Sequence, residues 1–109
     1  MAAELTVISW RDIPAQVTAK ESRTKARAPL SARFQLAIDS AAMAADMAGT
    51  DAYLEEWKRT SRECGGNLEV EVQREVDSLE AAWTNARLSA AAKAGGLDVA
   101  RPAGAEADA

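Results

Sequence analysis

The chain of 109 residues has 48% hydrophobic and 28% charged side chains and a formal net charge of −4. This length fits one domain with a modest core, and an acidic chain argues against bulk binding of nucleic acid. Histidine is absent, which removes the usual general base and the commonest metal ligand. We therefore expect a protein that is not an enzyme, with no catalytic residues, no cofactor and no metal site.

The N-terminus reads Met-Ala-Ala-Glu and has no basic region before an apolar run, as a secretory signal would have. No apolar run in the sequence approaches the length of a membrane span. Cys64 is the single cysteine, so no disulfide can form within the chain, which fits a reducing compartment. These features predict a cytoplasmic protein that makes no membrane contact.

Residues 5–17 form the densest block of strand-forming side chains and predict two strands joined by a turn. Both faces of the first strand carry apolar groups, Leu5 and Val7 on one and Ile8 and Trp10 on the other, which predicts a central strand. Pro14 lacks an N–H group and belongs at the turn or at the first position of the second strand. The second strand is expected to run over residues 15–20.

The tip of this hairpin, Trp10-Arg11-Asp12, allows two interpretations. Loops carry binding residues more often than the elements they connect. Large aromatic side chains, however, are mostly buried, so Trp10 can equally be a core residue beside a local Arg11–Asp12 pair.

The hairpin also carries a family resemblance. The stretch Trp-Arg-Asp-Ile-Pro-Ala-Gln-Val at residues 10–17 resembles the small bacterial "virulence factor" domain. Three later stretches resemble the same family: residues 30–34, residues 37–43, and Tyr53-Leu54 with Trp57. The resemblance covers about residues 4 to 92.

This family occurs as a stand-alone domain and at the C-terminal end of longer conserved virulence factor C proteins. The resemblance implies no reaction and no catalytic residues. Fusion to longer proteins in the family is consistent with an interaction module. Some stand-alone members of the family lie beside genes of one-carbon methyl transfer, which is consistent with an accessory subunit of such enzymes.

Residues 20–29 are polar and basic, without apolar periodicity, and predict a loop. Residues 11–33 hold six Lys/Arg against two Asp/Glu, a local charge of +4 in an acidic chain. The segment is either a solvated linker, as charge runs usually are, or a clamp for phosphate or for an acidic partner.

A first helix is predicted after Pro29 and Ser31, ending at Gly49. Its buried stripe consists of Leu30, Phe34, Ile38, Ala41 and Ala45. Leu36, Met43 and Met47 lie off this stripe and could form a contact face. Asp39 and Asp46 share one side of this helix but make a poor metal site without a third ligand.

A second helix is expected from the Thr50 cap, with Tyr53, Leu54 and Trp57 on its apolar face and Lys58 and Arg59 on its wet face. Residues 64–67, Cys-Gly-Gly-Asn, break the pattern before a third strand. Cys64 could be reactive if a neighbouring cation lowered its pKa, but its loop position favours an inert thiol.

The third strand is predicted over residues 68–73, where Leu, Val and Val alternate with Glu, Glu and Gln. A third helix follows from an Asp77–Glu80 capping box to about Ala92. Residues 94–109 are rich in Gly, Ala and acid, and they predict a flexible acidic tail behind a single domain of residues 1–93.

The sequence thus predicts an α+β domain with a small three-stranded sheet, in the order strand, strand, helix, helix, strand, helix, and with helices mainly on one face. The favoured function is a non-enzymatic module that binds a protein partner, and the open sheet edges also allow a homodimer. The alternative is an accessory subunit or a phosphate-ligand-binding domain. The candidate partner-binding residues are Trp10, Arg11, Asp12, Arg23, Lys25, Arg27 and Arg33.

Overall fold

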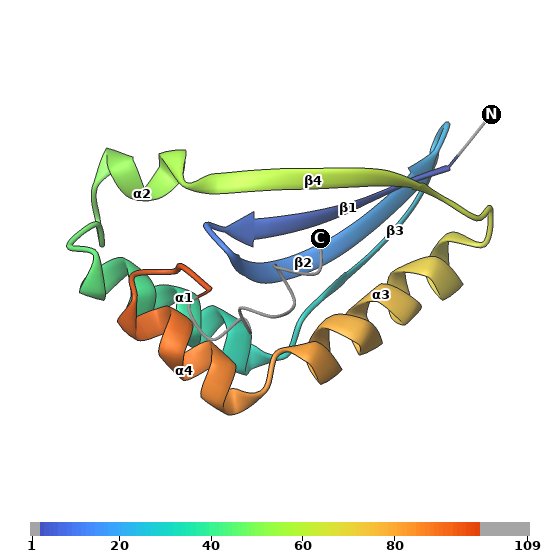
Figure 1. Ribbon diagram of the computed structural model, residues 1–109. Helices are drawn as coiled ribbons and strands as arrows, with labels where there is room; N and C mark the ends of the chain where they lie inside the picture. Colours follow the sequence, from blue (N-terminus) through green and yellow to red (C-terminus); the bar gives the residue numbers. More distant parts are fainter. Residues whose placement is uncertain (1–2, 99–109) are drawn as a thin grey trace, which may run out of the picture.

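The computed structural model describes residues 3–98 and places four strands in one antiparallel sheet. The strands are β1 (Ala3–Trp10), β2 (Ile13–Glu21), β3 (Thr24–Pro29) and β4 (Trp57–Cys64), in the spatial order β3-β2-β1-β4 (Figure 1). The helices are α1 (Ala32–Ala44), α2 (Asp51–Glu55), α3 (Leu68–Ala82) and α4 (Asn85–Lys93). An α+β fold is therefore confirmed, with one strand more than the sequence predicted.

The β1–β2 hairpin lies at the centre of this sheet, and β1 is an interior strand, as predicted from its two apolar faces. Leu5 faces Ala19 and Val7 faces Val17 across the hairpin. The register shifts between Ile8, which pairs with Gln16, and Ser9, which pairs with Pro14. Ala15 is the extra residue of this bulge, and a bulge is one of the few places where a sheet tolerates a proline.

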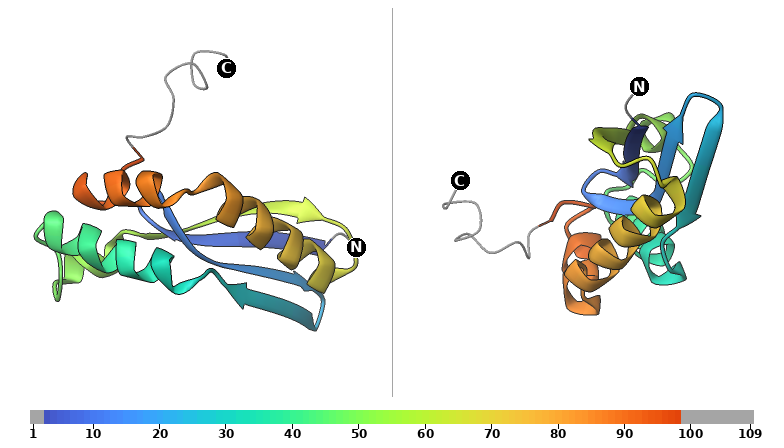
Figure 2. Two further views of the ribbon diagram at one scale, coloured as in Figure 1. Left: turned by 90° about the horizontal axis from the view of Figure 1, so that it is seen from below. Right: turned by 90° about the vertical axis from the view of Figure 1, so that its right-hand side faces the viewer.

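Helices cover one face of the sheet. The α3 helix packs across β2 and β3, while α1 packs against β2 and against α4 (Figure 2). The core lies between these layers and is built from Leu5, Ile13 and Val17 of the sheet with Phe34 and Ile38 of α1, all nearly or fully buried. The short α2 lies apart from this layer, at the start of β4.

The opposite face of the sheet is covered by none of α1, α3 and α4, and we call it the open face. The register places side chains of all four strands on it, because directly paired residues share a face. One row across the sheet is Arg27, Thr18, Thr6 and Ser61, in which the Thr6 and Ser61 hydroxyl oxygens lie 2.7 Å apart.

The basic segment of residues 20–29, predicted as a loop, is the end of β2 followed by β3. Lys25 and Arg27 point to the open face, whereas Ala26 and Ala28 pack against the core. The alternation of this strand was hidden because its apolar side consists only of alanines. A two-residue turn, Ser22-Arg23, joins β2 to β3.

The predicted second helix was wrong beyond its first turn. The Thr50 cap is confirmed, since its side chain accepts a hydrogen bond from the Tyr53 N–H group. The helix ends at Glu55, and Trp57–Cys64 is β4. The exposed positions of β4 carry only charged and hydroxyl side chains, so no apolar alternation marks this strand in the sequence.

The predicted third strand was also wrong, because residues 68–73 begin α3. The Asn67 side chain caps this helix by accepting from the Val70 N–H group. The buried residues Leu68, Val72 and Val76 recur every four positions, which is the helical spacing. Val70, which completed the apparent period of two, is exposed.

The boundaries of the other helices also differ from the prediction. The long final helix is divided at Trp83, where Thr84 caps α4 through the Arg87 N–H group. Asp77 therefore lies inside α3 and caps nothing. The first helix ends at Ala44 and not at Gly49, since Asp46 takes a left-handed conformation with φ 59°.

Residues 94–98, expected to open the flexible tail, pack onto the domain. Gly95 and Gly96 are buried, and Asp98 forms an ion pair with Arg87 of α4 at 2.6 Å. The rest of the predicted tail, residues 99–109, lies outside the described residues.

Candidate functional site

The structure separates the seven candidate residues into three places. Trp10, Arg11 and Asp12 lie at the β1–β2 turn, and we call these three the hairpin clasp. Arg33 lies in the first turn of α1. Arg23, Lys25 and Arg27 lie at the other end of the sheet, on the β2–β3 turn and on β3.

Trp10 is completely buried. Its indole Nε1–H donates to the Tyr53 carbonyl oxygen at 2.8 Å, and its ring stacks on the Tyr53 ring with centroids 5.5 Å apart. Gly96 approaches the ring so closely that an added Cβ would lie 2.8 Å from Trp10 Cζ3. The tryptophan therefore fixes α2 and the segment after α4 to the sheet.

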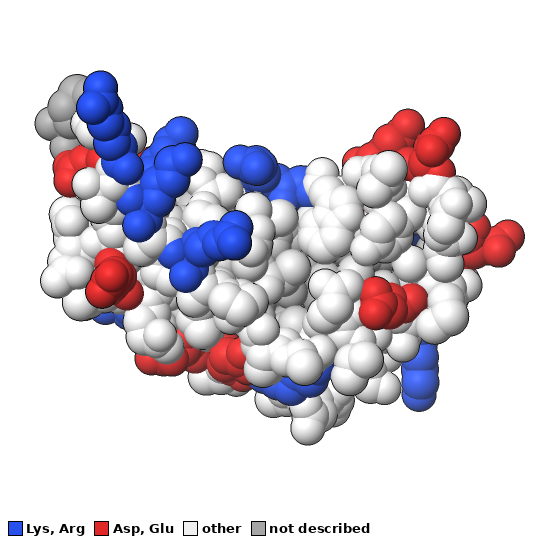
Figure 3. All heavy atoms as spheres, turned by 180° about the vertical axis from the view of Figure 1, so that it is seen from behind, with Lys and Arg blue, Asp and Glu red and all other residues white. Residues whose placement is uncertain are grey.

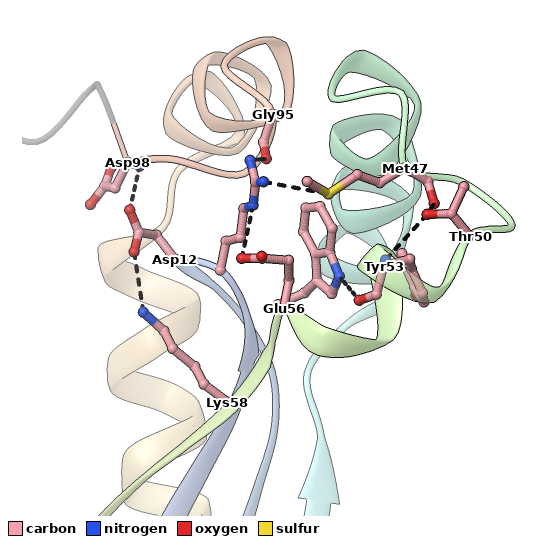
Figure 4. Close-up of polar contacts among 10 residues, drawn as sticks. Asp12, Met47, Thr50, Tyr53, Glu56, Lys58, Gly95 and Asp98 are labelled. Atoms are coloured by element: carbon pink, nitrogen blue, oxygen red, sulfur yellow. Dashed lines mark hydrogen bonds and ion pairs between the residues drawn. The ribbon is translucent and has the colours of Figure 1, made fainter.

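Arg11 has a left-handed backbone with φ 52°, which costs a non-glycine residue about 1–2 kcal/mol. Its guanidinium group forms an ion pair with Glu56 at 3.1 Å and donates to the Gly95 carbonyl oxygen at 2.9 Å. It also contacts the Met47 sulfur at 3.4 Å (Figure 4). These contacts offset the backbone strain. They also engage the N–H donors of the Arg11 side chain with acceptors of the same domain.

Asp12 joins the same network. Its carboxylate accepts from the Asp98 backbone N–H group at 2.8 Å and from Lys58 Nζ at 3.4 Å (Figure 4). Its own N–H group donates to the Gly96 carbonyl oxygen at 3.0 Å. The hairpin clasp thus brings together three distant parts of the chain, and its polar groups are bonded within the domain.

Arg33 is engaged in a second internal network. Its guanidinium group donates to the carbonyl oxygens of Glu80 and Trp83 and forms an ion pair with the Glu80 carboxylate at 3.1 Å. Burial raises the pKa of Glu80, but hydrogen bonds from the Ser31 N–H and hydroxyl groups and from Arg33 outweigh this effect and leave the pKa below its ordinary value. This network ties the start of α1 to the end of α3.

Lys25 and Arg27, in contrast, are exposed on the open face. They line a shallow hollow of about 520 Å³ together with Thr18, Lys20 and Arg59. Figure 3 shows the Lys and Arg side chains gathered in the upper left part of the molecule as seen from behind. Arg23 is exposed beside this hollow in the β2–β3 turn.

Lys20 and Arg59 belong to this basic surface but were not predicted. Lys20 lies directly opposite Lys25 on β2, and Arg59 lies on β4, a strand that the sequence did not reveal. We call Lys20, Lys25, Arg27 and Arg59 the basic cluster. The alternation of residues 15–20 could have predicted that Lys20 lies on the exposed face of its strand. The position of Arg59 could not be predicted in this way, because it depends on pairing between strands about fifty residues apart.

Ion pairing divides the cations of the molecule into two groups. Six of the twelve described Lys and Arg residues form ion pairs: Arg11, Arg33, Lys58, Arg62, Arg74 and Arg87. Of the six described cations outside these pairs, all except Lys93 belong to the basic cluster or to the adjoining turn. Glu4 and Glu63 lie on the open face in the row that continues from Lys25 and Lys20.

Cys64, at the end of β4, was the one candidate nucleophile. Its pKa is raised above the ordinary value, first by desolvation and then by the charge of Glu71, although Arg62 acts in the opposite direction. The thiol is therefore neutral at pH 7 and poorly nucleophilic. Residues 3–98 contain no group of three Cys, Asp or Glu side chains placed to hold a metal ion.

The fold and the basic cluster define a small α+β domain with one helix-covered and one open sheet face, and no helix within residues 3–98 is long and apolar enough to cross a membrane. A family model described as "Virulence factor" matches residues 8–91, and the chain belongs to this family. The resemblance noted in the β1–β2 hairpin is thereby confirmed. Comparisons with curated proteins and with solved structures give no match.

Proposed function

We propose that this domain is a non-enzymatic interaction module that binds an acidic segment of a partner protein across the open face of its sheet. The observation that carries the proposal is the concentration of cations without an ion-pair partner, among the described residues, at one end of that face. Such a patch attracts carboxylates and speeds their association.

The surroundings of the basic cluster favour a short acidic peptide over a polynucleotide. No aromatic side chain lines the hollow, so nucleobases have no stacking platform there. Glu4 and Glu63 continue the same row toward β4 and repel a polyanion that extends across the sheet. A carboxylate segment that follows β3 avoids both glutamates.

The absence of histidine from the chain and the raised pKa of Cys64 support a binding role over a catalytic one. The hairpin clasp and Arg33 support it further, because their charged groups are used in contacts within the domain. Arg23 remains at the rim of the proposed surface and Lys25 and Arg27 at its centre.

The test is a titration of the isotope-labelled protein with a short polyglutamate peptide, followed by two-dimensional NMR. We expect shifts confined to the open-face residues of β2 and β3, and binding that weakens steeply with salt. Replacing Lys25 and Arg27 with Ala should weaken binding about fivefold or more at low salt, since each exposed ion pair contributes about 0.2–1 kcal/mol.

The matched control replaces Arg74 and Lys93 with Ala, which removes the same charge from exposed sites on α3 and α4. Equal weakening by both double variants would mean that only net charge matters and would refute a specific surface. The same pair of variants should then be compared in affinity capture from a cell lysate, where a specific partner is lost with the first variant and kept with the second.

A phosphate-bearing ligand is the second candidate, favoured by the Thr18 hydroxyl beside Lys20, Lys25 and Arg27 in the hollow. Lys and Arg side chains with a hydroxyl group suit a phosphate ester as well as a carboxylate. Titration with inorganic phosphate distinguishes the two. If the NMR signals of Thr18 shift saturably with phosphate and do not shift with the peptide, the ligand of this surface is a phosphate compound and not an acidic protein segment.

A further inference from the structure

The β4 strand forms an edge of the sheet along which no helix within residues 3–98 packs: α2 contacts it near its start, and α3 reaches it through the Arg62–Glu75 ion pair. It pairs with β1 on one side only, and its residues Lys58 to Glu63 are all exposed (Figure 1). The other edge, β3, is shielded by contact with α3 and ends in Pro29. The β4 edge therefore presents a row of unpaired backbone N–H and C=O groups to any other strand.

Two of the usual devices that block edge pairing are missing from β4. It contains no proline, and its register with β1 runs from Ala3–Cys64 to Trp10–Trp57 without a bulge. Charged side chains are the remaining device. Charges exclude some partners and some registers, but they favour an incoming strand whose charges are complementary.

We propose that this strand is a second copy of β4, added antiparallel to the first, so that two four-stranded sheets join into one. A symmetric pair of this kind has a two-fold axis perpendicular to the sheet, which keeps the open faces of both copies on the same side. Successive side chains of a strand point to opposite faces of the sheet, and two residues paired directly across the interface must point to the same face. In a symmetric antiparallel pair this is possible only when one residue of β4 lies directly opposite the same residue of the second copy. We call that residue the centre of the pairing.

The charges of β4 permit only one such centre between Arg59 and Glu63. Centres at Arg59, Arg62 or Glu63 place that charged residue opposite itself, and a centre at Thr60 places Lys58 opposite Arg62. A centre at Ser61 places Arg59 opposite Glu63 twice, with Thr60 opposite Arg62 and no like charges facing. Opposite charges on facing positions stabilise a sheet, and like charges destabilise it.

This register also agrees with the open face. Ser61, already bonded to Thr6, lies at the two-fold axis, so the polar row continues from one copy into the other. Glu63, the acidic residue nearest to the edge, is neutralised by Arg59 of the second copy. Dimerisation engages Arg59 of the basic cluster, whereas Lys20, Lys25 and Arg27 remain without an ion pair on each copy, so the dimer carries two such basic surfaces without depending on the proposed function.

One added strand buries a small area, so the dimer should be weak and concentration-dependent. Sedimentation velocity of the purified full chain, over an about hundredfold range of concentration, should show a reversible monomer–dimer equilibrium.

Charge variants test the register of this dimer. Arg59→Glu or Glu63→Arg alone should weaken dimerisation about tenfold or more, since each places two like-charge pairs at the interface. The double variant Arg59→Glu/Glu63→Arg exchanges the charges and should restore it. Lys93→Glu on α4 is the control with an equal charge change.

The register is tested by cross-linking in a Cys64→Ser background, which removes the native thiol. Ser61→Cys should give a disulfide-linked dimer under mild oxidation, because this position faces itself, and Thr60→Cys should give far less. A protein that stays monomeric over the whole range overturns the proposal, as does a dimer that the single charge variants leave unchanged. Preferential cross-linking through Thr60→Cys overturns the register. Each outcome is read without any partner and is independent of the peptide titration.

Discussion

The two turns at the ends of β2 have similar backbones and opposite surroundings. Each is a two-residue turn whose first residue takes a left-handed conformation without being glycine, Arg11 with φ 52° and Ser22 with φ 55°. Arg11 is held by Glu56, Gly95 and Met47, whereas Ser22 and Arg23 are exposed. Nine residues of strand place the two turns about 30 Å apart.

The two turns therefore show that local sequence does not determine which basic side chains are exposed for binding a partner. The local charge of +4 in residues 11–33 suggested one binding surface, but the fold divides it between the two ends of β2 and the first turn of α1. At one end the charges stabilise the fold, and at the other they remain exposed. Substitutions at equivalent places in the two turns should therefore have unequal effects.

The largest effect is expected at the buried ring of the hairpin clasp. Trp10→Ala should lower the free energy of unfolding by about 3–5 kcal/mol, because it leaves a cavity and removes the bond to the Tyr53 carbonyl. Urea unfolding measures this loss. Trp10→Phe keeps an aromatic ring and should cost clearly less, and a loss under about 1 kcal/mol for Trp10→Ala would contradict its burial.

Gly96→Ala should cost about 2–4 kcal/mol, since the new Cβ meets the Trp10 ring and the backbone has φ 104°. Gly49→Ala is the matched control, because Gly49 also has a left-handed φ of 77° but has no atom within 4 Å of an added Cβ. The control should show only the backbone cost of about 1–2 kcal/mol. Equal losses in thermal unfolding would mean that the contact with Trp10 contributes nothing.

The arginines of the two turns give the most direct comparison. Arg11→Ala should cost about 1–3 kcal/mol, because it leaves Glu56 and the Gly95 carbonyl without their partner. Arg23→Ala should change the free energy of unfolding by less than about 0.5 kcal/mol. If both substitutions had the same effect on urea unfolding, the contrast between the clasped and the exposed turn would fail.

A smaller loss of stability is expected at Glu80. This residue pairs with Arg33, another candidate cation whose charge is used within the domain. Glu80→Gln should cost about 1 kcal/mol at neutral pH, because the pair is partly exposed. The pKa of Glu80 is lowered in the folded state, so its contribution is present above its ordinary pKa of 4.5 and is lost as the pH falls through the folded-state value. Unfolding measured from pH 7 to pH 3 should show the two proteins converging below about pH 4.5. A constant difference across this range would argue against a charged Glu80 as the source.

The β1–β2 hairpin was predictable because its side chains are strong strand formers and because Pro14 marks the start of the second strand. The short β3 was missed because alanines supply its apolar side. The α3 helix was misread because Val70 completes an alternation over residues 68–73, and only the longer spacing of Leu68, Val72 and Val76 corrects it. The β4 strand has no apolar pattern, and its place depends on pairing with β1.

The same reasons explain how much of the candidate site could be predicted. Lys25 and Arg27 were identified by their local charge, which is a property of the sequence. The inward role of Arg11 could not be predicted, because its acceptors Glu56 and Gly95 lie 45 and 84 positions away in the chain. The contacts of Arg33 could not be predicted for the same reason, since Glu80 lies 47 positions from it.

The contact between Arg11 and Gly95 has a consequence for folding order. The first hairpin contains strain that is offset by residues 36 to 84 positions further along the chain, so during synthesis the turn lacks the last of its stabilising partners until nearly the whole domain has emerged. Contacts of such long sequence separation slow folding, because a large loop must close before they form. The domain should therefore fold as one cooperative unit after translation, with closure of the clasp among its last steps.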